Sequence, residues 1–149
     1  MKKGLILFLL SLILSSCLSQ AFNNQIPTDK SETQFSSEDL PIVKGKILSK
    51  SEPVSGQILF LGTVLSDPVS GQELAVSLDR SNAPKFVTNS DGTFYFKNVL
   101  YGKYGLMLIS GIDSFLLLYP RTQDAIIIAV EQLTIYDLGI LDYDLLPLE

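Results

Sequence analysis

The sequence of 149 residues contains no histidine and no tryptophan, and it has a single cysteine. The lack of histidine removes the usual general base, the commonest zinc ligand and the middle member of hydrolase triads. Most hydrolytic mechanisms are therefore disfavoured, although a pair of carboxylates of the kind that cleaves glycosidic bonds is compatible with the composition. We expect no catalysis, no metal and no cofactor.

Basic residues are also scarce. Removal of the N-terminal residues 1–16 would take Lys2 and Lys3 from the eleven basic residues, leaving nine against 16 acidic ones and a formal net charge of −7. The nine are scattered along the chain, whereas nucleic-acid binding generally needs a basic patch to neutralise phosphates. We expect no nucleic-acid partner.

The N-terminal residues have the pattern of a secretory signal. Lys2 and Lys3 form a short positive end, and the eleven residues 4–14 are almost wholly apolar. A helix needs roughly 20 residues to cross a hydrocarbon core of about 30 Å. We therefore expect export followed by removal of this segment.

The only cysteine stands at the end of this apolar run. Leu14-Ser15-Ser16-Cys17 resembles the lipobox of bacterial lipoproteins, which has an aliphatic residue, two small residues and then cysteine. The resemblance implies that residues 1–16 are cleaved off as a lipoprotein signal peptide and that Cys17 receives a diacylglycerol on its thiol. Its new amino group can be acylated as well. Two or three acyl chains anchor a protein firmly, whereas one chain binds a bilayer only marginally.

Two other interpretations of this region stay open. The small residues at alternate positions in Ser19-Gln20-Ala21 also suit ordinary signal cleavage, which would release a secreted protein. In the second interpretation, Cys17 is simply one more residue of a hydrophobic stretch and has no special role. With one cysteine no intrachain disulfide can form, so the exported chain must be stable through packing alone.

The segment that follows is polar. Residues 17–40 are rich in Ser, Asn, Gln and Thr, with isolated apolar residues and no sustained period. Such a composition cannot bury enough surface to order itself. We expect a lipidated cysteine followed by a flexible linker that separates a folded domain from the bilayer.

Short apolar runs alternate with turn signals over residues 41–149, and no ten-residue stretch has the spacing of an amphipathic helix. The pattern predicts an all-β domain that is large enough to fold without disulfides. The expected strands are Ile42 to Ser49, Gln57 to Leu65, Leu74 to Leu78, Lys85 to Asn89, Thr93 to Lys97, Lys103 to Ile109, Phe115 to Tyr119, Ala125 to Val130 and Gln132 to Ile140.

Two turn patterns are well defined. FVTNSDGTFYFKNV, residues 86–99, predicts a β-hairpin because Asn89, Asp91 and Gly92 favour a tight turn between alternating residues. Asp67-Pro-Val-Ser-Gly-Gln72 echoes Glu52-Pro-Val-Ser-Gly-Gln57, and a reused turn explains this echo more simply than a repeat. A pair of loops that present matched polar edges to a partner is the alternative.

Several of these elements, in this order, resemble the carboxypeptidase regulatory-like domains, which are transthyretin-like sandwiches related to the collagen-adhesin B-type repeats. They are VKGKI (43–47), EPVSGQILF (52–60), TNSDGTFYFKNVLYGKYGLML (88–108) and IYDLGIL (135–141). The resemblance implies an antiparallel Greek-key β-sandwich of about seven to nine strands over residues 41–149. It also implies scaffolding or binding rather than chemistry, because the catalytic relatives use histidines that this chain lacks.

Four residues of the predicted sandwich are candidates for special roles. Related adhesin domains form a lysine isopeptide bond, and Lys44 or Lys46 in the first strand could meet Asp137 in the last. Ordinary surface charges explain all three residues more simply. Tyr101, in the turn before Gly102, is a weak candidate for contact with a ligand, because exposed aromatic rings serve sandwich modules as binding platforms.

The sequence therefore predicts a lipid-anchored, non-catalytic protein of the bacterial cell envelope, at the outer membrane or the cell surface. The expected partners are membrane lipid through acylated Cys17 and an envelope protein or polysaccharide. Two alternatives stay open. One is an accessory subunit that docks a partner through the apolar late strands SFLLLY (114–119) and AIIIAV (125–130), although burial inside the sandwich explains these strands too. The other is a carbohydrate-binding module.

Overall fold

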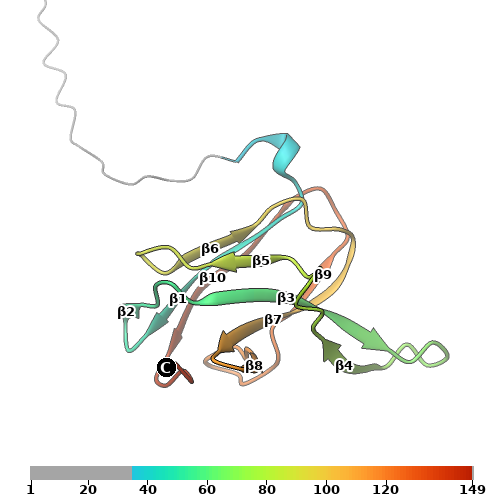
Figure 1. Cartoon of the computed structure of the whole chain (residues 1–149). Helices are drawn as coiled ribbons and strands as arrows, with labels where there is room; N and C mark the ends of the chain where they lie inside the picture. The colour runs from blue at the N-terminus through green and yellow to red at the C-terminus, as the bar shows by residue number, and fades with distance from the viewer. Residues whose placement is uncertain (1–34, 149) are drawn as a thin grey trace, which may run out of the picture. The chain divides into compact units, whose positions relative to one another are not determined.

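The computed structural model describes residues 35–148. This part of the chain contains a 3-10 helix and ten strands, and Figure 1 shows their arrangement. They are η1 (Ser37–Asp39), β1 (Ile42–Ser49), β2 (Glu52–Pro53), β3 (Ile58–Ser66), β4 (Glu73–Ser77), β5 (Lys85–Val87), β6 (Thr93–Phe96), β7 (Gly102–Ser110), β8 (Asp113–Leu116), β9 (Ile127–Val130) and β10 (Ile135–Tyr143).

The strands form two sheets. In the first sheet β1 is central, with β10 along one edge and β6 followed by β2 along the other. In the second sheet β3 and β7 are central; β4 and β5 pair with β3, while β8 and β9 pair with β7. The predicted all-β sandwich is therefore confirmed.

One pairing departs from the expected antiparallel arrangement. The first and last strands, β1 and β10, run parallel, so the prediction of an entirely antiparallel sheet needs this correction. A parallel pair requires a crossover between its strands, and here the whole second sheet lies between them in sequence. The pairing shifts register between Lys44 and Lys46, where Gly139 adopts a φ of 67° and donates its N–H to Asp137 Oδ1 at 2.8 Å.

A single core fills the space between the two sheets. Alternate residues of several strands point into this core, because successive side chains of a strand point to opposite faces. They include Val43 and Ile47 of β1, Leu59 and Leu61 of β3, Phe94 and Phe96 of β6, and Tyr104, Leu106 and Leu108 of β7. Full burial of one such apolar side chain stabilises the fold by about 1.5–3 kcal/mol.

The predicted hairpin over residues 86–99 is a corner between the sheets. β5 pairs with β3 in one sheet, whereas β6 pairs with β1 in the other. The tight turn itself is present, because Asn89 N donates to Thr93 O at 2.9 Å and Gly92 has a φ of 81°. The local pattern predicted that β5 and β6 would pair with each other. They instead pair with strands of different sheets, where their phenylalanine side chains are buried in the core or packed against it.

The outer face of the second sheet carries a smaller apolar layer. Gly62 of β3 pairs with Gly105 of β7, and an added Cβ at either position would lie within 3 Å of Val76 side-chain atoms. Leu116 covers Gly105 in the same way. The edge strands β4 and β8 therefore curl over the two glycines, and Arg80 Nη2 joins the two edges by donating to Ile112 O at 2.7 Å.

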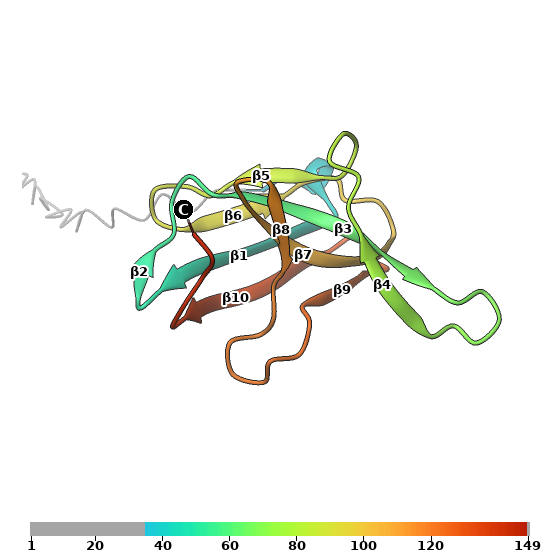
Figure 2. The same ribbon diagram turned by 60° about the horizontal axis from the view of Figure 1, so that its bottom comes forward.

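The hairpin of β3 and β4 extends beyond the sandwich as an arm (Figure 2). Its tip is the second copy of the echoed motif, in which Asp67 accepts hydrogen bonds from Val69 N and Ser70 N at 2.9 and 2.7 Å. The first copy forms a different turn, yet Gly56 and Gly71 both have positive φ, at 74° and 71°. The two copies therefore share the positive φ of their glycines, and the interpretation of a reused turn stays a prediction.

Each of the late apolar runs places only part of its residues in the core. Leu117, Ile126, Ile128 and Val130 belong to the core, as the burial interpretation expected. The strands are shorter than predicted, since β8 ends at Leu116 and β9 begins at Ile127. The last strand is shifted along the chain and runs from Ile135 to Tyr143.

Candidate functional site

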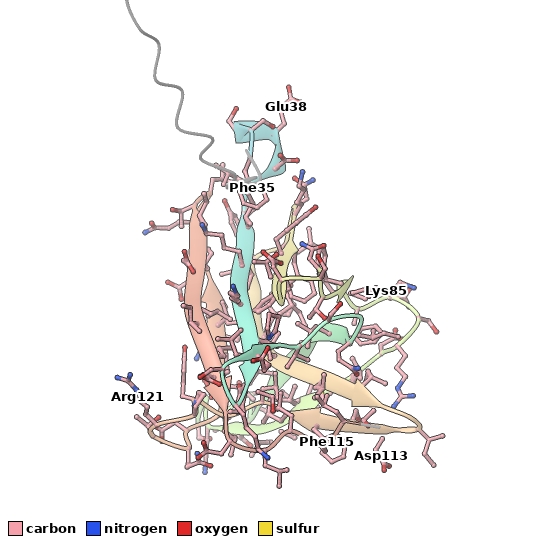
Figure 3. The ribbon with its side chains drawn as sticks, turned by 90° about the vertical axis from the view of Figure 1, so that its left-hand side faces the viewer. Phe35, Glu38, Lys85, Asp113, Phe115 and Arg121 are labelled. Carbon is pink, nitrogen blue, oxygen red and sulfur yellow. The ribbon has the colours of Figure 1, made fainter. Side chains whose placement is uncertain are left out.

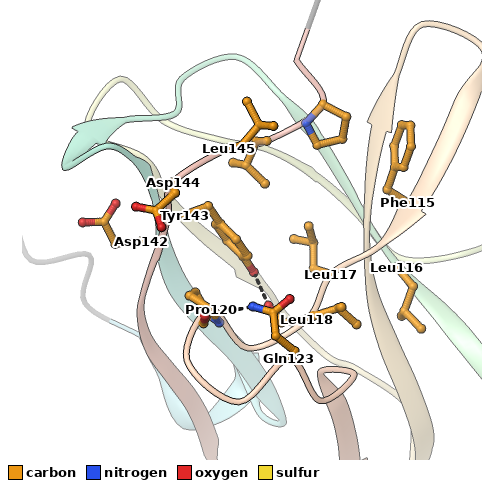
Figure 4. A pocket seen from close by; sticks show the side chains of 12 residues that line it. Phe115, Leu116, Leu117, Leu118, Pro120, Gln123, Asp142, Tyr143, Asp144 and Leu145 are labelled. Carbon is orange, nitrogen blue, oxygen red and sulfur yellow. Dashed lines mark hydrogen bonds between the residues drawn. The ribbon is translucent and has the colours of Figure 1, made fainter.

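A hollow of about 320 Å³ lies at one end of the sandwich, where the segment after β8 meets the C-terminal residues. Figure 4 shows its walls. They are Phe115, Leu116, Leu117, Leu118, Pro120, Gln123, Asp142, Tyr143, Asp144, Leu145, Leu146 and Pro147. We call this feature the distal hollow, because Figure 3 shows Phe115 and Asp113 at the end of the sandwich opposite Phe35 and Glu38.

Backbone hydrogen bonds hold the apolar wall of the distal hollow. Leu117 N donates to Leu106 O of β7 at 2.8 Å, and Ile126 N donates to Leu117 O at 3.0 Å. Leu117 is buried in the core, while Phe115 and Leu118 each remain 36% exposed at the wall. The segment 114–119 is apolar on both faces. One face thus packs in the core, and the other lines the distal hollow.

Tyr143 connects the C-terminal segment to this wall. Its hydroxyl donates to Leu118 O at 2.9 Å. Burial, assisted by the neighbouring Tyr119 phenol, raises the pKa of Tyr143 far above its usual value of 10.0, so the group stays neutral. Leu146, three residues further along the chain, is buried and fixes the C-terminal segment that lines the hollow.

Polar side chains from two segments also line the distal hollow. Asp142 accepts hydrogen bonds from Ser51 N and Ser51 Oγ, both at 3.0 Å, which fixes its carboxylate beside the β1–β2 turn. Gln123, with a φ of 62°, donates its side-chain amide to Pro120 O at 2.9 Å. Asp144 is exposed at the rim. A hollow lined by apolar side chains together with carboxylates and an amide can hold a ligand that has both apolar groups and hydrogen-bond donors.

The prediction from sequence found only part of this site, because the docking alternative named residues 114–119 but not the C-terminal wall. The last expected strand ended at Ile140, so Tyr143 and the residues after it were not assigned to an element. The spacing of the apolar residues was the available signal for this segment. Leu141 and Leu146 are buried in the core, and Tyr143 is partly buried.

Tyr101, the predicted ligand contact, lies at the other end of the sandwich. It is 62% exposed and does not line the distal hollow. Tyr104, two residues after Gly102, is a core residue whose hydroxyl donates to Leu100 O at 3.0 Å, and this bond shapes the turn that presents Tyr101. A role of Tyr101 in ligand binding stays a prediction.

Lys44 and Asp137 do face each other. They are register partners in β1 and β10, and Lys44 Nζ lies 3.2 Å from Asp137 Oδ2. Their side chains are 37% and 53% exposed, as is usual for a surface ion pair. This arrangement agrees with the simpler interpretation of ordinary surface charges.

Cys17 and the predicted signal peptide and most of the linker lie outside the described residues. Phe35 to Leu40, the end of the expected linker, contact the sandwich. Phe35 packs edge-on against Tyr95 with ring centroids 5.2 Å apart, and Asp39 pairs with Lys97 at 3.1 Å.

Two kinds of feature are absent from the described part of the chain. Between residues 35 and 148 there is no cluster of three or more side chains suited to hold a metal ion. Nor does this region contain a helix that is long and apolar enough to span a bilayer. The expectation of no metal and no cofactor stays a prediction.

Comparisons with known proteins are distant. No family model and no curated protein matches the sequence. Among solved structures, a 9R-lipoxygenase from Cyanothece matches with a TM-score of 0.41 and 18% identity over 76% of this chain and 18% of its own. A candidate carbohydrate-binding protein from Pseudomonas aeruginosa matches with a TM-score of 0.40 and 13% identity over 72% and 90%.

A DUF3823 family protein from Parabacteroides merdae matches with a TM-score of 0.37 and 12% identity, over 68% of this chain and 44% of its own. This chain therefore spans less than a fifth of the lipoxygenase and less than half of the DUF3823 protein. At such TM-scores these likenesses carry no argument about function, which must come from the residues themselves.

Proposed function

We propose that this protein is a non-catalytic, lipid-anchored module of the bacterial cell envelope, which binds another envelope component in the distal hollow. The observation that carries the proposal is the position of this hollow at the end of the sandwich opposite Phe35 (Figure 3). A chain anchored through Cys17 would enter the sandwich at one end and leave the other accessible to partners.

The chemistry of the distal hollow supports binding rather than catalysis. Its titratable side chains are Asp142, Tyr143 and Asp144. Ser51 holds the first of these carboxylates, and burial keeps the Tyr143 phenol neutral. No group in this set is both activated and free to attack a substrate, whereas the apolar wall and polar rim suit recognition.

A photo-crosslinking experiment tests the proposed site. A photoreactive amino acid replaces Leu118 or Leu145 in the hollow of the full-length protein, and Val69 at the tip of the arm is the matched exposed control. We expect one discrete adduct in the envelope from Leu118 and Leu145 but none from Val69. Adducts from Val69 alone would move the binding surface to the arm and contradict the proposal.

The accessory-subunit alternative uses the same place. The late strands are buried on their inner face, and a partner can reach the exposed side chains of Phe115 and Leu118 where they line the hollow. Such a partner would contribute an apolar side chain as its anchor. A Leu118→Asp substitution would then abolish the protein adduct made from Leu145.

A polysaccharide partner is favoured by a different observation, namely the aromatic ring of Tyr143 beside Gln123 and Asp144 (Figure 4). Sugars bind to aromatic faces with their C–H groups and to carboxylates and amides with their hydroxyls. A glycan panel compares the unchanged protein with Asp144→Ala and with Tyr101→Ala. Loss of binding in the first variant alone supports the hollow, whereas loss in the second alone supports Tyr101.

A further inference from the structure

Exposed apolar side chains gather at the end of the sandwich where the described chain begins. They are Leu100 and Tyr101 in the connection between β6 and β7, and Leu133 in the connection between β9 and β10. Their exposed fractions are 78%, 62% and 65%. We call these three residues the proximal patch.

Hydrogen bonds show that these segments adjoin one another. Gly102 pairs with Val130, which brings the β6–β7 and β9–β10 connections side by side. Asn98 N donates to Asp39 O at 2.9 Å, and Ile42 N donates to Thr134 O at 3.0 Å. The two connections that carry the proximal patch therefore adjoin the start of the described chain, and Figure 1 shows both connections close to η1.

Local contacts hold the patch in place. The Tyr104 hydroxyl bonds to Leu100 O, and the Tyr136 hydroxyl accepts hydrogen bonds from Glu131 N and Gln132 N at 2.8 and 2.9 Å. Two buried or half-buried tyrosines thus brace the two connections. The exposed side chains are held by folded backbone, which lowers the entropy cost of presenting them to another surface.

The charges around the patch do not form a basic surface. Lys97 pairs with Asp39, Lys103 with Glu73 and Lys44 with Asp137, at 3.1, 2.9 and 3.2 Å. Glu38 and Glu131 add negative charge nearby. We therefore do not expect this end of the sandwich to be attracted to anionic headgroups. The exposed side chains of the proximal patch are leucine and tyrosine, which suit the interfacial region of a bilayer.

We propose that the proximal patch rests on the lipid surface and inserts Leu100, Tyr101 and Leu133 into its interfacial region. This inference rests on the proposed lipid anchor. Only 17 residues, 18–34, separate Cys17 from Phe35. A flexible linker of that length, as the composition predicts, would span about 20 to 25 Å. At that distance the effective concentration of lipid is high, so a weak apolar contact becomes populated.

Intrinsic fluorescence tests the contact, because the chain has no tryptophan. The Leu133→Trp variant carries a single reporter in the patch. Ile112→Trp is the matched control, since Ile112 is 89% exposed and precedes Asp113 at the opposite end. Both full-length, membrane-purified proteins are reconstituted in phosphatidylcholine vesicles, with or without bromine on the acyl chains, and co-sedimentation and intact mass are recorded.

We expect brominated lipid to quench the tryptophan of Leu133→Trp severalfold more than that of Ile112→Trp. Added phosphatidylglycerol or salt should leave the difference unchanged. Equal quenching of the two variants, or no quenching at position 133 in a co-sedimenting acylated protein, would overturn the inference while the anchor stands. Protein that lacks acyl mass and stays in the supernatant would instead overturn the proposed anchor and, with it, this contact.

A second variant separates the patch from the anchor. Leu100→Ser combined with Leu133→Ser changes only exposed side chains, so the unfolding midpoint should hardly move. With Tyr101→Trp as the reporter, quenching by brominated lipid should fall severalfold although co-sedimentation is retained. Unchanged quenching would mean that the tether alone brings this end to the lipid, and would also overturn the inference.

Discussion

Gly62 and Gly105 face each other across β3 and β7, and Val76 packs over both. Because neither glycine has a side chain, the edge strand β4 can fold over the outer face of the sheet from one side. Leu116, at the end of β8, covers Gly105 from the other side. This small outer layer braces the segment that leads into the distal hollow.

Gly62→Ala should destabilise the protein by about 1–3 kcal/mol, as overpacking typically does. The added Cβ would lie 2.7 Å from Val76 Cγ1 and 3.0 Å from Ser77 O, and the backbone oxygen cannot move away cheaply. Urea unfolding measures the loss. In combination with Val76→Ala, the total should be less than the sum of the single losses, whereas strict additivity would contradict the proposed contact.

Tyr104→Phe should lower stability by about 1 kcal/mol, because it removes the hydrogen bond to Leu100 O while the ring stays in the core. The same measurement on Tyr101→Phe is the control, since its exposed hydroxyl should matter by less than about 0.5 kcal/mol. Equal effects of the two substitutions would show that the Tyr104 bond does not stabilise the turn.

Alkaline pH should destabilise the fold through Tyr143. Because burial raises the pKa of this phenol in the folded state, the unfolded chain ionises first, near its ordinary pKa of 10.0. The stabilisation is complete below that pH and is lost as the pH rises above about 10. Tyr143→Phe should reduce this alkaline loss and cost about 1 kcal/mol at neutral pH for the bond to Leu118 O. An unchanged alkaline limb would contradict the assignment.

Acid should destabilise the fold through carboxylates that accept hydrogen bonds in turns. The Thr93 hydroxyl and then its N–H lower the pKa of Asp91, while Ser70 N–H and hydroxyl groups lower that of Asp67. A lowered pKa means that the stabilisation is present above about pH 4 and disappears as the pH falls through the folded value. Asp91→Asn should flatten the decline measured by unfolding below about pH 5, and Asp113→Asn controls for the loss of one charge.

The local alternation of residues predicted most of the strands. Burial in a sandwich follows the period of two, so Leu59 and Leu61 or Phe94 and Phe96 could be assigned to the core from sequence. Which sheet a strand joins is a long-range choice, so the pattern paired β5 with β6 although they belong to different sheets. The parallel pairing of β1 with β10 was missed for the same reason.

The candidate site was harder to predict. Tyr143 carries no motif, and its contact with Leu118 joins segments 25 residues apart. The distal hollow exists only because the chain after β10 folds back beside β8, which neither composition nor periodicity specifies. Lipidation of Cys17, in contrast, could be predicted from sequence, because a short contiguous motif indicates it and no tertiary contact is needed.

The intact mass of the full-length protein from the membrane fraction tests the central claim most directly. Cys17→Ala is compared with Ala21→Leu, which blocks the alternative cleavage after Ala21 but leaves Leu14 to Cys17 unchanged. The account predicts a mass of residues 17–149 plus acyl chains, with no loss of water between Lys44 and Asp137. This product should persist in Ala21→Leu, and both acylation and membrane retention should be lost in Cys17→Ala. A soluble, unmodified chain beginning at Phe22 would contradict the account.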